Sequence, residues 1–595
     1  MASRARRDGD RLLAALVQLA IVVPALAVGW VRDDGRIAAV LYREPKLVAA
    51  GVLGWTFAAA FLWAWRRRLT AADLAAAIER PAMLALGAFL AYLAATGLWV
   101  RVPQNYFYEL DQYLLLALLV VLLLAWTERD ARLPGRVRAG LVASLAAVTA
   151  VGVLQILAPL PFLSPIDPEI GVAHPSLMGY KNPAALAVLG QLFLLAGWVA
   201  ETRGNAGRGV SRRLGLGLLL AVELVYLVSL RSRTSYAALA AGSVFLVGLW
   251  LARRPPRRAL LRGAAAAAAA IALVAAAVAI HAPARERARS ALAYAASPRA
   301  YLESDRGVYL RNTLNMARHR PLGVGLGDWQ TQYPVFRSVR RTADFMDPPP
   351  DVDVRRAHSD HVQLLGEAGW PGLVLWLGFL LLLAAAPIRG YLRDGRPGAL
   401  FAAAQVVALA AAMASDYYLE MPYHKLQFFL VVYLALAAPP RRPNGRAPCA
   451  PTPTKAMPAA AVVLALVALL QLGYHVLLAR KVALAAAVAT SYRRGDAAAV
   501  LAAGRELAAV PGHTKTLFRD YLLVAHSARQ AGADALAGAA ARKSLELHPY
   551  HLNALRFMAT VAADPETAAH WRRAYEHVRD EAVHGYEARY PPSDP

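Results

Sequence analysis

The chain has 595 residues, of which 58% are hydrophobic, and its formal net charge is +25 at pH 7. This hydrophobic content is too high for a water-soluble globular chain and indicates a polytopic membrane protein. The charge does not indicate nucleic-acid binding, because arginine supplies 58 of the 65 cations and is spread over the whole chain. The single cysteine, Cys449, excludes an internal disulfide framework.

Apolar stretches long enough to cross about 30 Å of hydrocarbon occur about thirteen times. They lie near residues 12–31, 48–65, 82–100, 112–126, 139–160, 184–200, 214–230, 235–251, 263–280, 371–387, 399–415, 424–438 and 457–474. The first has a rival interpretation as a cleaved signal peptide, because Ala25-Leu26-Ala27 resembles a cleavage site. Its apolar run continues to Val31, which favours a retained helix. We therefore predict an all-α, polytopic membrane fold.

The connections between these stretches differ in positive charge. The N-terminus and one alternate set of loops hold 28 lysines and arginines, whereas the short loops of the other set hold 8. Cytoplasmic loops carry the excess of Lys and Arg, so the N-terminus is predicted inside and the C-terminus outside. The richer loops are 66–80, 127–138, 201–213, 252–262, 388–398 and 439–456.

Two segments are then left outside the membrane. The connection 281–366 is far longer than a link between two spans requires. The other is 477–595, which follows a membrane domain predicted over 1–476.

The C-terminal segment is rich in alanine with helical periodicity. Its helix breakers recur after 37 residues, from Gly495 to Gly532, and after 38 residues, from Pro511 to Pro549. This period favours a tetratricopeptide-like array, with an irregular helical bundle as the alternative. Either form is expected to serve as a docking surface for a protein partner.

Four polar motifs lie on the predicted outer side. They are, in chain order, Met178-Gly179-Tyr180-Lys181-Asn182-Pro183, Ser232-Arg233-Thr234-Ser235, the segment from Arg306 to Pro321-Leu322-Gly323-Val324-Gly325-Leu326-Gly327, and Ala357-His358-Ser359-Asp360 followed by Glu367-Ala368-Gly369. In these motifs and their order, roughly residues 80–440 resemble the O-antigen ligase and polymerase superfamily of bacterial inner-membrane glycan transferases. Ser359 stands where that family usually has asparagine, and Leu310 where an aromatic residue is common.

The resemblance implies a GT-C-like fold with its active site and C-terminal domain in the periplasm. It implies inverting, metal-independent transfer of a glycan from an undecaprenyl diphosphate carrier to a sugar hydroxyl, with no cofactor. Ligase-type transfer to lipid A-core is favoured. A polymerase that extends the glycan on its carrier and a protein O-oligosaccharyltransferase remain alternatives.

Arginines in two of the motifs suit such a donor. The diphosphate leaving group gains negative charge as the glycosidic bond breaks, and a guanidinium binds phosphate oxygens bidentately and stays charged. Arg233 and Arg306 match family positions, and Arg311 lies one to two turns further along the same predicted helix. We expect these three to bind the donor diphosphate, with Lys181 and Asn182 in support.

His358 is the candidate for activating the acceptor hydroxyl, because imidazole accepts a proton near neutral pH without a metal. His361, one turn further on, is expected only to pack. Glu367 precedes a predicted helix break, and a loop arginine is its candidate partner.

Two metal motifs and two other protein classes are weaker interpretations. Asp351-Val352-Asp353 and Asp33-Asp34 look like metal sites, but each lacks its expected context. A polysaccharide or lipid transporter usually needs ionisable residues within the bilayer, and Glu223 is the only clear mid-span charge in the sequence. A scaffold for an envelope complex does not explain the motifs around Arg233 and His358.

Overall fold

The structure is a computed structural model. It describes residues 2–33, 36–41, 43–65, 70–158, 175–202, 209–258, 304–337, 354–437 and 458–580, with scattered positions between 261 and 297. Within these residues, nine helices are long and apolar enough to cross a membrane, which supports a multi-pass membrane protein. They are α2 (Arg43–Trp65), α4 (Pro81–Ala95) with its 3-10 turn, α5 (Pro103–Thr127), α6 (Leu133–Leu157), α7 (Lys181–Glu201), α9 (Arg233–Ala252), α15 (Asp360–Asp394), α16 (Pro397–Ser415) and α18 (Pro458–Arg493).

Three further predicted spans coincide with helices that fall short of this criterion. These are α1 (Ala2–Leu26), α8 (Gly209–Ser229) and α17 (Pro422–Leu436). The predicted span 263–280 lies largely outside the described residues. The main addition to the all-α prediction is an antiparallel hairpin of β1 (Gly29–Asp33) and β2 (Arg36–Leu41) in the first predicted external loop.

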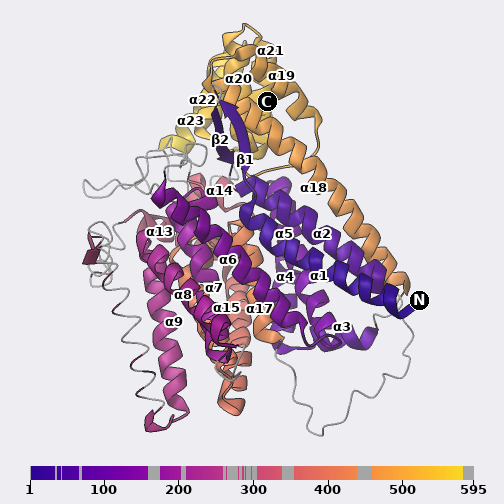
Figure 1. The fold of residues 1–595 in the computed structure, drawn as a ribbon. Helices are drawn as coiled ribbons and strands as arrows, with labels where there is room; N and C mark the ends of the chain where they lie inside the picture. Colours follow the sequence, from indigo (N-terminus) through magenta and orange to yellow (C-terminus); the bar gives the residue numbers. More distant parts are fainter. Residues whose placement is uncertain are drawn as a thin grey trace.

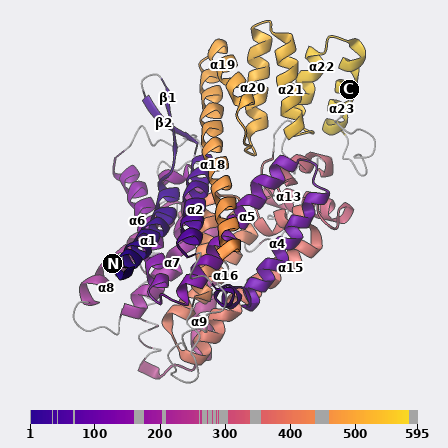
Figure 2. The same cartoon turned by 90° about the vertical axis from the view of Figure 1, so that its right-hand side faces the viewer.

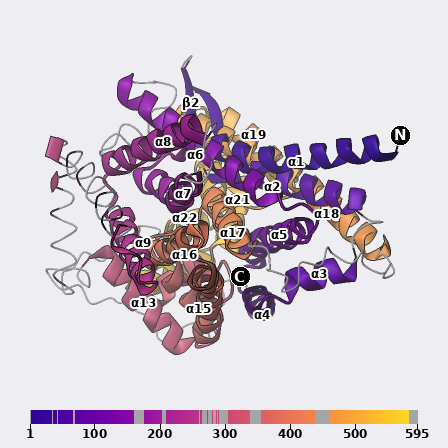
Figure 3. The ribbon, with the colours of Figure 1, turned by 60° about the horizontal axis from the view of Figure 1, so that its bottom comes forward.

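Helix α17 forms the centre of the membrane bundle. Each of its residues from Pro422 to Tyr433 is buried, and it packs against α2, α5, α7, α15 and α16 (Figure 3). Its charged and amide side chains are therefore buried among other helices, where they need polar partners.

The first helix is tied into the bundle by Lys46 of α2. The Lys46 ammonium is fully buried and donates hydrogen bonds to the carbonyl oxygens of Pro24, Ala25 and Ala27, at 3.4, 2.8 and 3.0 Å. A cation at a helix C-terminus satisfies carbonyls that the helix leaves unpaired. Cleavage after Ala27 would remove these acceptors and leave a buried charge, which supports a retained first helix.

Helix α15 is broken at Gly369, where the backbone has φ +63°. The glycine-rich stretch after α13 (Asp305–His319) pairs with this break, because the amides of Val324 and Gly325 donate to the carbonyls of Gly366 and Glu367, both at 2.9 Å. A Cβ on Gly369 would overlap the Pro321 carbonyl. The predicted helix break thus fixes the segment after α13 against the first two turns of α15.

The C-terminal helices lie over one end of the bundle (Figures 1 and 2). They are α19 (Ala497–Ala509), α20 (Leu517–Gln530), α21 (Asp534–Leu547), α22 (Leu552–Val561) and α23 (Pro565–Asp580). Helix α18 runs unbroken from the bundle into them, so no linker separates the two parts at residue 477. Successive helices pack against one another, and Gly495, Gly512 and Gly532 adopt positive φ at the turns. The tetratricopeptide-like assignment stays a prediction.

These helices share a hydrophobic core with α13 and the segment that follows it. Tyr309, Trp329 of α14 (Trp329–Gln332) and Tyr333 belong to the same buried cluster as Phe518 and Trp571. The C-terminal region is therefore packed onto the segment that follows α13, and is not a freely tethered domain.

The opposite end of the bundle holds arginine ion pairs in the loops predicted to be cytoplasmic. They include Arg129–Asp73 at 2.6 Å, Arg138–Glu201 at 2.6 Å and Arg396–Asp394 at 3.3 Å. Figure 1 shows α3 (Ala71–Ile78) at this end, away from the C-terminal helices.

The charge distribution makes a testable prediction about orientation. Reporter fusions after residues 210, 395 and 450 are expected to be cytoplasmic, and fusions after 300 and 500 periplasmic, because Lys and Arg concentrate on the inner side. Paired alkaline phosphatase and fluorescent protein fusions measure both states. A cytoplasmic fusion at 500 would contradict the prediction, since the C-terminal helices and α13 lie at the same end.

Candidate active site at the ends of four helices

His358 lies two residues before α15, in a turn where its backbone adopts the left-handed conformation. Its φ is +53°, and the next residue, Ser359, caps the helix by accepting a hydrogen bond from the Val362 amide at 3.3 Å. Serine is a favoured cap, so it replaces the asparagine of the related motif without losing this bond. Ser359 also donates to the Met413 carbonyl at 3.1 Å, which ties this turn to α16.

The His358 ring is held between two aromatic rings. Tyr309 of α13 stacks on it, with centroids 5.6 Å apart and an interplanar angle of 16°. Tyr417 meets it edge-on at 5.0 Å. The His358 side chain is 36% exposed, so the ring is fixed in orientation yet accessible from outside.

A buried carboxylate, Asp416, joins the separate motifs. Its side chain is 0% exposed and accepts a hydrogen bond from Asn182 Nδ2 at 3.0 Å. The Arg306 guanidinium lies 3.5 Å from the same carboxylate oxygen, and His358 Nδ1 lies 3.8 Å from the other.

None of the four sequence motifs contains Asp416. The available signal was its position, because it follows the apolar stretch 399–415 directly, in a short predicted external loop without a lysine or arginine. An acidic residue at the membrane boundary of such a loop was a candidate partner for the external arginines.

Four helices begin around this carboxylate. Asn182 is the second residue of α7, Thr234 the second of α9 and Arg306 the second of α13, and His358 precedes α15 by two residues. The N-terminus of a helix carries partial positive charge and free amide groups, which favour an anion such as phosphate. The site thus combines helix N-termini with basic side chains.

Arg306 of α13 contacts the first turn of α9, which begins with Arg233. Arg306 donates a hydrogen bond to Thr234 Oγ1 at 3.2 Å, and Thr234 in turn donates to the Ser415 carbonyl at 3.3 Å. Arg233 is the half-buried residue before Thr234, in a turn capped by the Ser232 side chain. The Arg306 side chain is 29% exposed, so it can meet a ligand from outside while it contacts Asp416.

Arg311 and Lys181 are less closely associated with the site. Arg311 is exposed and lies five residues after Arg306, which is about 140° around an α-helix at about 100° per residue. Lys181 is half-buried and directly precedes Asn182. Their predicted roles at the diphosphate stay predictions.

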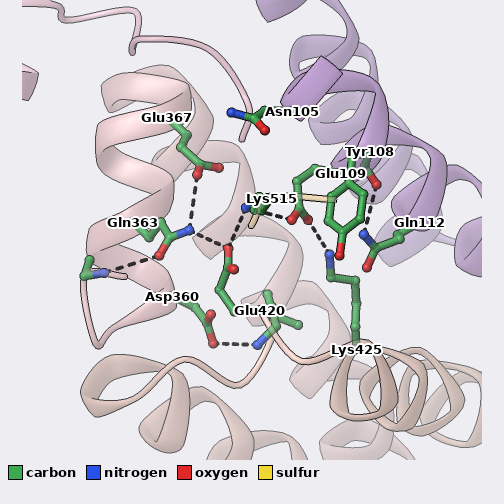
Figure 4. A network of polar contacts seen from close by, with 12 residues as sticks. Asn105, Tyr108, Glu109, Gln112, Asp360, Gln363, Glu367, Glu420, Lys425 and Lys515 are labelled. Carbon is green, nitrogen blue, oxygen red and sulfur yellow. Dashed lines mark hydrogen bonds and ion pairs between the residues drawn. The ribbon is translucent and has the colours of Figure 1, made fainter. Parts of the chain in front are cut away.

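Glu367 has partners other than the loop arginine that we expected. It is buried and accepts a hydrogen bond from Gln363 Nε2 at 3.2 Å (Figure 4). Gln363 also donates to Glu420. Glu367 therefore belongs to a buried polar network beside the site.

This network carries three cations and several carboxylates. Glu109 lies between Lys425 at 2.6 Å and Lys515 at 2.7 Å. Glu420 lies between Lys515 and Arg43, each at 3.2 Å. A small cavity opens beside these carboxylates, lined by residues that include Glu109, Asp360, Glu367 and Glu420.

The network adds buried ionisable residues near the helix ends to Glu223, the mid-span charge noted in the sequence. Glu223 is not the only ionisable residue buried within the membrane helices, because Lys46, Glu109 and Lys425 are buried there too. Glu109 and Lys425 lie in the first two turns of α5 and α17 and pair with each other, so they are partners in the network at the end of the bundle.

The candidate metal motifs receive no support from the described residues. Asp34, Asp351 and Asp353 lie outside the part of the chain that the structure describes. Among described residues, no three His, Cys, Asp or Glu side chains form a group suited to a metal ion. Metal-independent transfer stays a prediction.

The comparison with protein families concerns the part of the chain that carries most of these residues. Residues 216–377 match the sequence model of the O-antigen ligase family. The match supports the ligase and polymerase superfamily and indicates a glycan-transferring enzyme. None of the curated proteins matches the chain. The matched range contains Arg233, Arg306, Arg311, His358 and Glu367, whereas Asn182 and Asp416 lie outside it and enter the site through the fold.

Proposed function

We propose that this O-antigen ligase-like chain transfers a glycan from undecaprenyl diphosphate to a sugar hydroxyl at the periplasmic face of the bacterial inner membrane. The observation that carries the proposal is the meeting of Arg306, Asn182 and His358 on Asp416. These groups come from three motifs that are far apart in the sequence.

The donor diphosphate is assigned to the arginine side of the site. Arg306, Arg233 and the N-termini of α9 and α13 supply positive charge where the leaving group gains negative charge. The glycosidic bond between the anomeric carbon and the diphosphate oxygen breaks, and its electron pair goes to that oxygen. Fixed positive charge stabilises the leaving diphosphate without a cofactor.

The acceptor is assigned to His358. Its Nε2 takes the proton as the acceptor hydroxyl oxygen bonds to the anomeric carbon, opposite the leaving group, so the configuration inverts. Asp416 faces Nδ1 at 3.8 Å and stabilises the imidazolium that forms. The stacked Tyr309 keeps the ring in the orientation that this transfer needs.

Ligase-type transfer to lipid A-core is the form that we favour. Polymerisation on the carrier lipid and transfer to a protein hydroxyl use the same two steps and differ only in the acceptor. The membrane lipids around the bundle deliver the carrier, and the C-terminal helices remain a candidate surface for a protein partner. A transporter is disfavoured, because the chemistry-bearing groups gather at one end of the bundle.

The donor assignment is tested at Arg306. Arg306→Lys keeps the charge but loses the planar fork, so we expect a fall of about 10²–10³-fold in the transfer rate and weaker binding of undecaprenyl diphosphate. Purified variants in nanodiscs are assayed with a lipid extract from a strain that lacks the chain, which holds both donor and acceptor.

Arg318→Lys is the matched control, because Arg318 is exposed in the last turn of the same helix. It is expected to transfer at the normal rate. Normal transfer and normal binding by Arg306→Lys would contradict the assignment of the diphosphate to this side of the site.

A further inference from the structure

The C-terminal region reaches the membrane bundle through a short connection between α19 and α20. His513 Nε2 in this connection lies 2.7 Å from Asn105 Oδ1 of α5. Two residues later, Lys515 is only 6% exposed, and its ammonium lies 2.7 Å from Glu109 and 3.2 Å from Glu420 (Figure 4). The connection thus places a buried cation inside the polar network at the end of the bundle.

Of the two carboxylates that pair with Lys515, Glu420 is the one on the same connection as Asp416. It belongs to the six-residue connection 416–421 between α16 and α17, four residues after Asp416. Burial alone would raise the pKa of Glu420, but Lys515 and Arg43 outweigh burial and hold this pKa below its usual value. Glu420 is therefore an ionised group that Lys515 fixes in place.

The same connection is fixed on its other side by α15. The Leu419 amide donates to Asp360 Oδ2 at 2.9 Å, and Gln363 donates to Glu420. The Asp360 amide in turn donates to the Asp416 carbonyl at 3.3 Å. The connection that carries Asp416 is thus clamped between the first turn of the His358 helix and a lysine of the C-terminal region.

We propose that Lys515 is a positioning residue for glycan transfer, through which the C-terminal helices hold Glu420 and the 416–421 connection so that Asp416 meets Arg306 and His358. This inference rests on the proposed function of the site. It makes the C-terminal helices part of the active-site scaffold, in addition to their predicted role as a docking surface. In the described part of the chain Lys515 forms ion pairs with Glu109 and Glu420, so it acts on the site through Glu420.

The test compares turnover with donor binding in the full chain. Lys515→Met is expected to lower turnover of the lipid extract by about 10- to 100-fold, because misplacement by about 1 Å is sufficient for such a loss. Binding of undecaprenyl diphosphate is expected to change by less than about threefold, since the arginines keep their places on α9 and α13. Lys515→Arg keeps the cation and is expected to retain most of the turnover.

A double variant separates positioning from the cost of a buried carboxylate that has lost one of its cations. In Lys515→Met, Glu420 keeps Arg43 but loses Lys515, and adding Glu420→Gln removes this carboxylate charge, so the melting temperature of the double variant is expected to exceed that of Lys515→Met. Its turnover is expected to stay low, because the tie from the C-terminal helices to the connection is still absent. Recovery of both stability and turnover would overturn the proposal.

Arg101→Gln is the control for docking alone. The Arg101 guanidinium lies over the Tyr550 ring at 5.3 Å, which is another contact between the bundle and the C-terminal helices, and it is not a partner of Glu420. Normal turnover of this variant is expected, and a loss equal to that of Lys515→Met would show that docking alone matters. Normal turnover of Lys515→Met would also overturn the proposal.

His358→Ala in the same assay keeps the two proposals apart. If His358→Ala is inactive and Lys515→Met is normal, only the positioning role is wrong. If His358→Ala is active, the proposed function is itself wrong, whatever the result at Lys515.

Discussion

Replacing His358 with alanine is expected to reduce glycan transfer by about 10²–10⁴-fold, the usual contribution of a general base. The loss should fall on turnover, because the imidazole takes the acceptor proton only as the bond to the anomeric carbon forms. Binding of undecaprenyl diphosphate is expected to persist, since Arg306 and Arg233 lie on other helices. Transfer by purified variants and binding of the carrier lipid are measured side by side.

His361→Ala is the matched control one turn along α15. His361 Nδ1 accepts a hydrogen bond from Trp376 Nε1 at 3.1 Å, and its Nε2 lies 3.1 Å from the Ala410 carbonyl. Both ring nitrogens therefore have partners within the bundle, and we expect at most a modest loss of stability with transfer retained. An inactive His361→Ala, or an active His358→Ala, would move the proposed base elsewhere.

Asp416→Asn is expected to lower transfer by about 10²–10³-fold, although the exchange is nearly isosteric. The carboxylate faces both a guanidinium and an imidazole, and an amide removes the charge that fixes the first and stabilises the protonated form of the second. Because Arg306 loses its anchor, donor binding is expected to weaken as well. The combined loss of turnover and binding distinguishes this variant from His358→Ala.

A control for Asp416→Asn comes from the other end of the bundle. Asp130 pairs with Arg136 at 3.0 Å, and both side chains are partly exposed. Such ion pairs contribute at most about 1 kcal/mol, so Asp130→Asn is expected to transfer normally. Wild-type transfer by Asp416→Asn would show that the buried carboxylate only packs.

Hydropathy located most of the bundle because a membrane span needs a run of apolar residues, and this property is local. Hydropathy is less informative for a helix that is surrounded by other helices and not by lipid. Helix α17 has fifteen residues and is surrounded by protein, so it carries Lys425 and Gln427 that a lipid-exposed span would not tolerate. The break in α15 was also predictable, because Gly369 and Pro371 interrupt a helical pattern.

The site was predictable only in part. The motifs around Arg306 and His358 predicted side chains that gather at one end, since each lies at or just before a helix start on the predicted outer side. Asp416 has no comparable motif, and its contact with Asn182 joins residues 234 positions apart. Such a contact depends on how α7, α13 and α16 pack, which periodicity and composition do not encode.

The C-terminal region shows the same limit. Its alanine-rich periodicity predicted helices, but a docking surface was all that could be inferred from them. That Lys515 would be buried against Glu109 and Glu420 depends on how the region packs on the bundle. Within the sequence itself, Lys515 is one of seven lysines with no distinguishing motif.

The hydrophobic core that Tyr309 and Trp329 share with Phe518 and Trp571 has a consequence for biogenesis. The ribosome makes the segment with Tyr309 about two hundred residues before the helices that cover it. During that interval its apolar surface has no permanent partner, and the final span must cross before the last helices can dock. With the C-terminal helices in the periplasm, as proposed above, maturation of the chain is expected to finish late, and slow export of these helices would leave inserted but inactive chains exposed to periplasmic proteases.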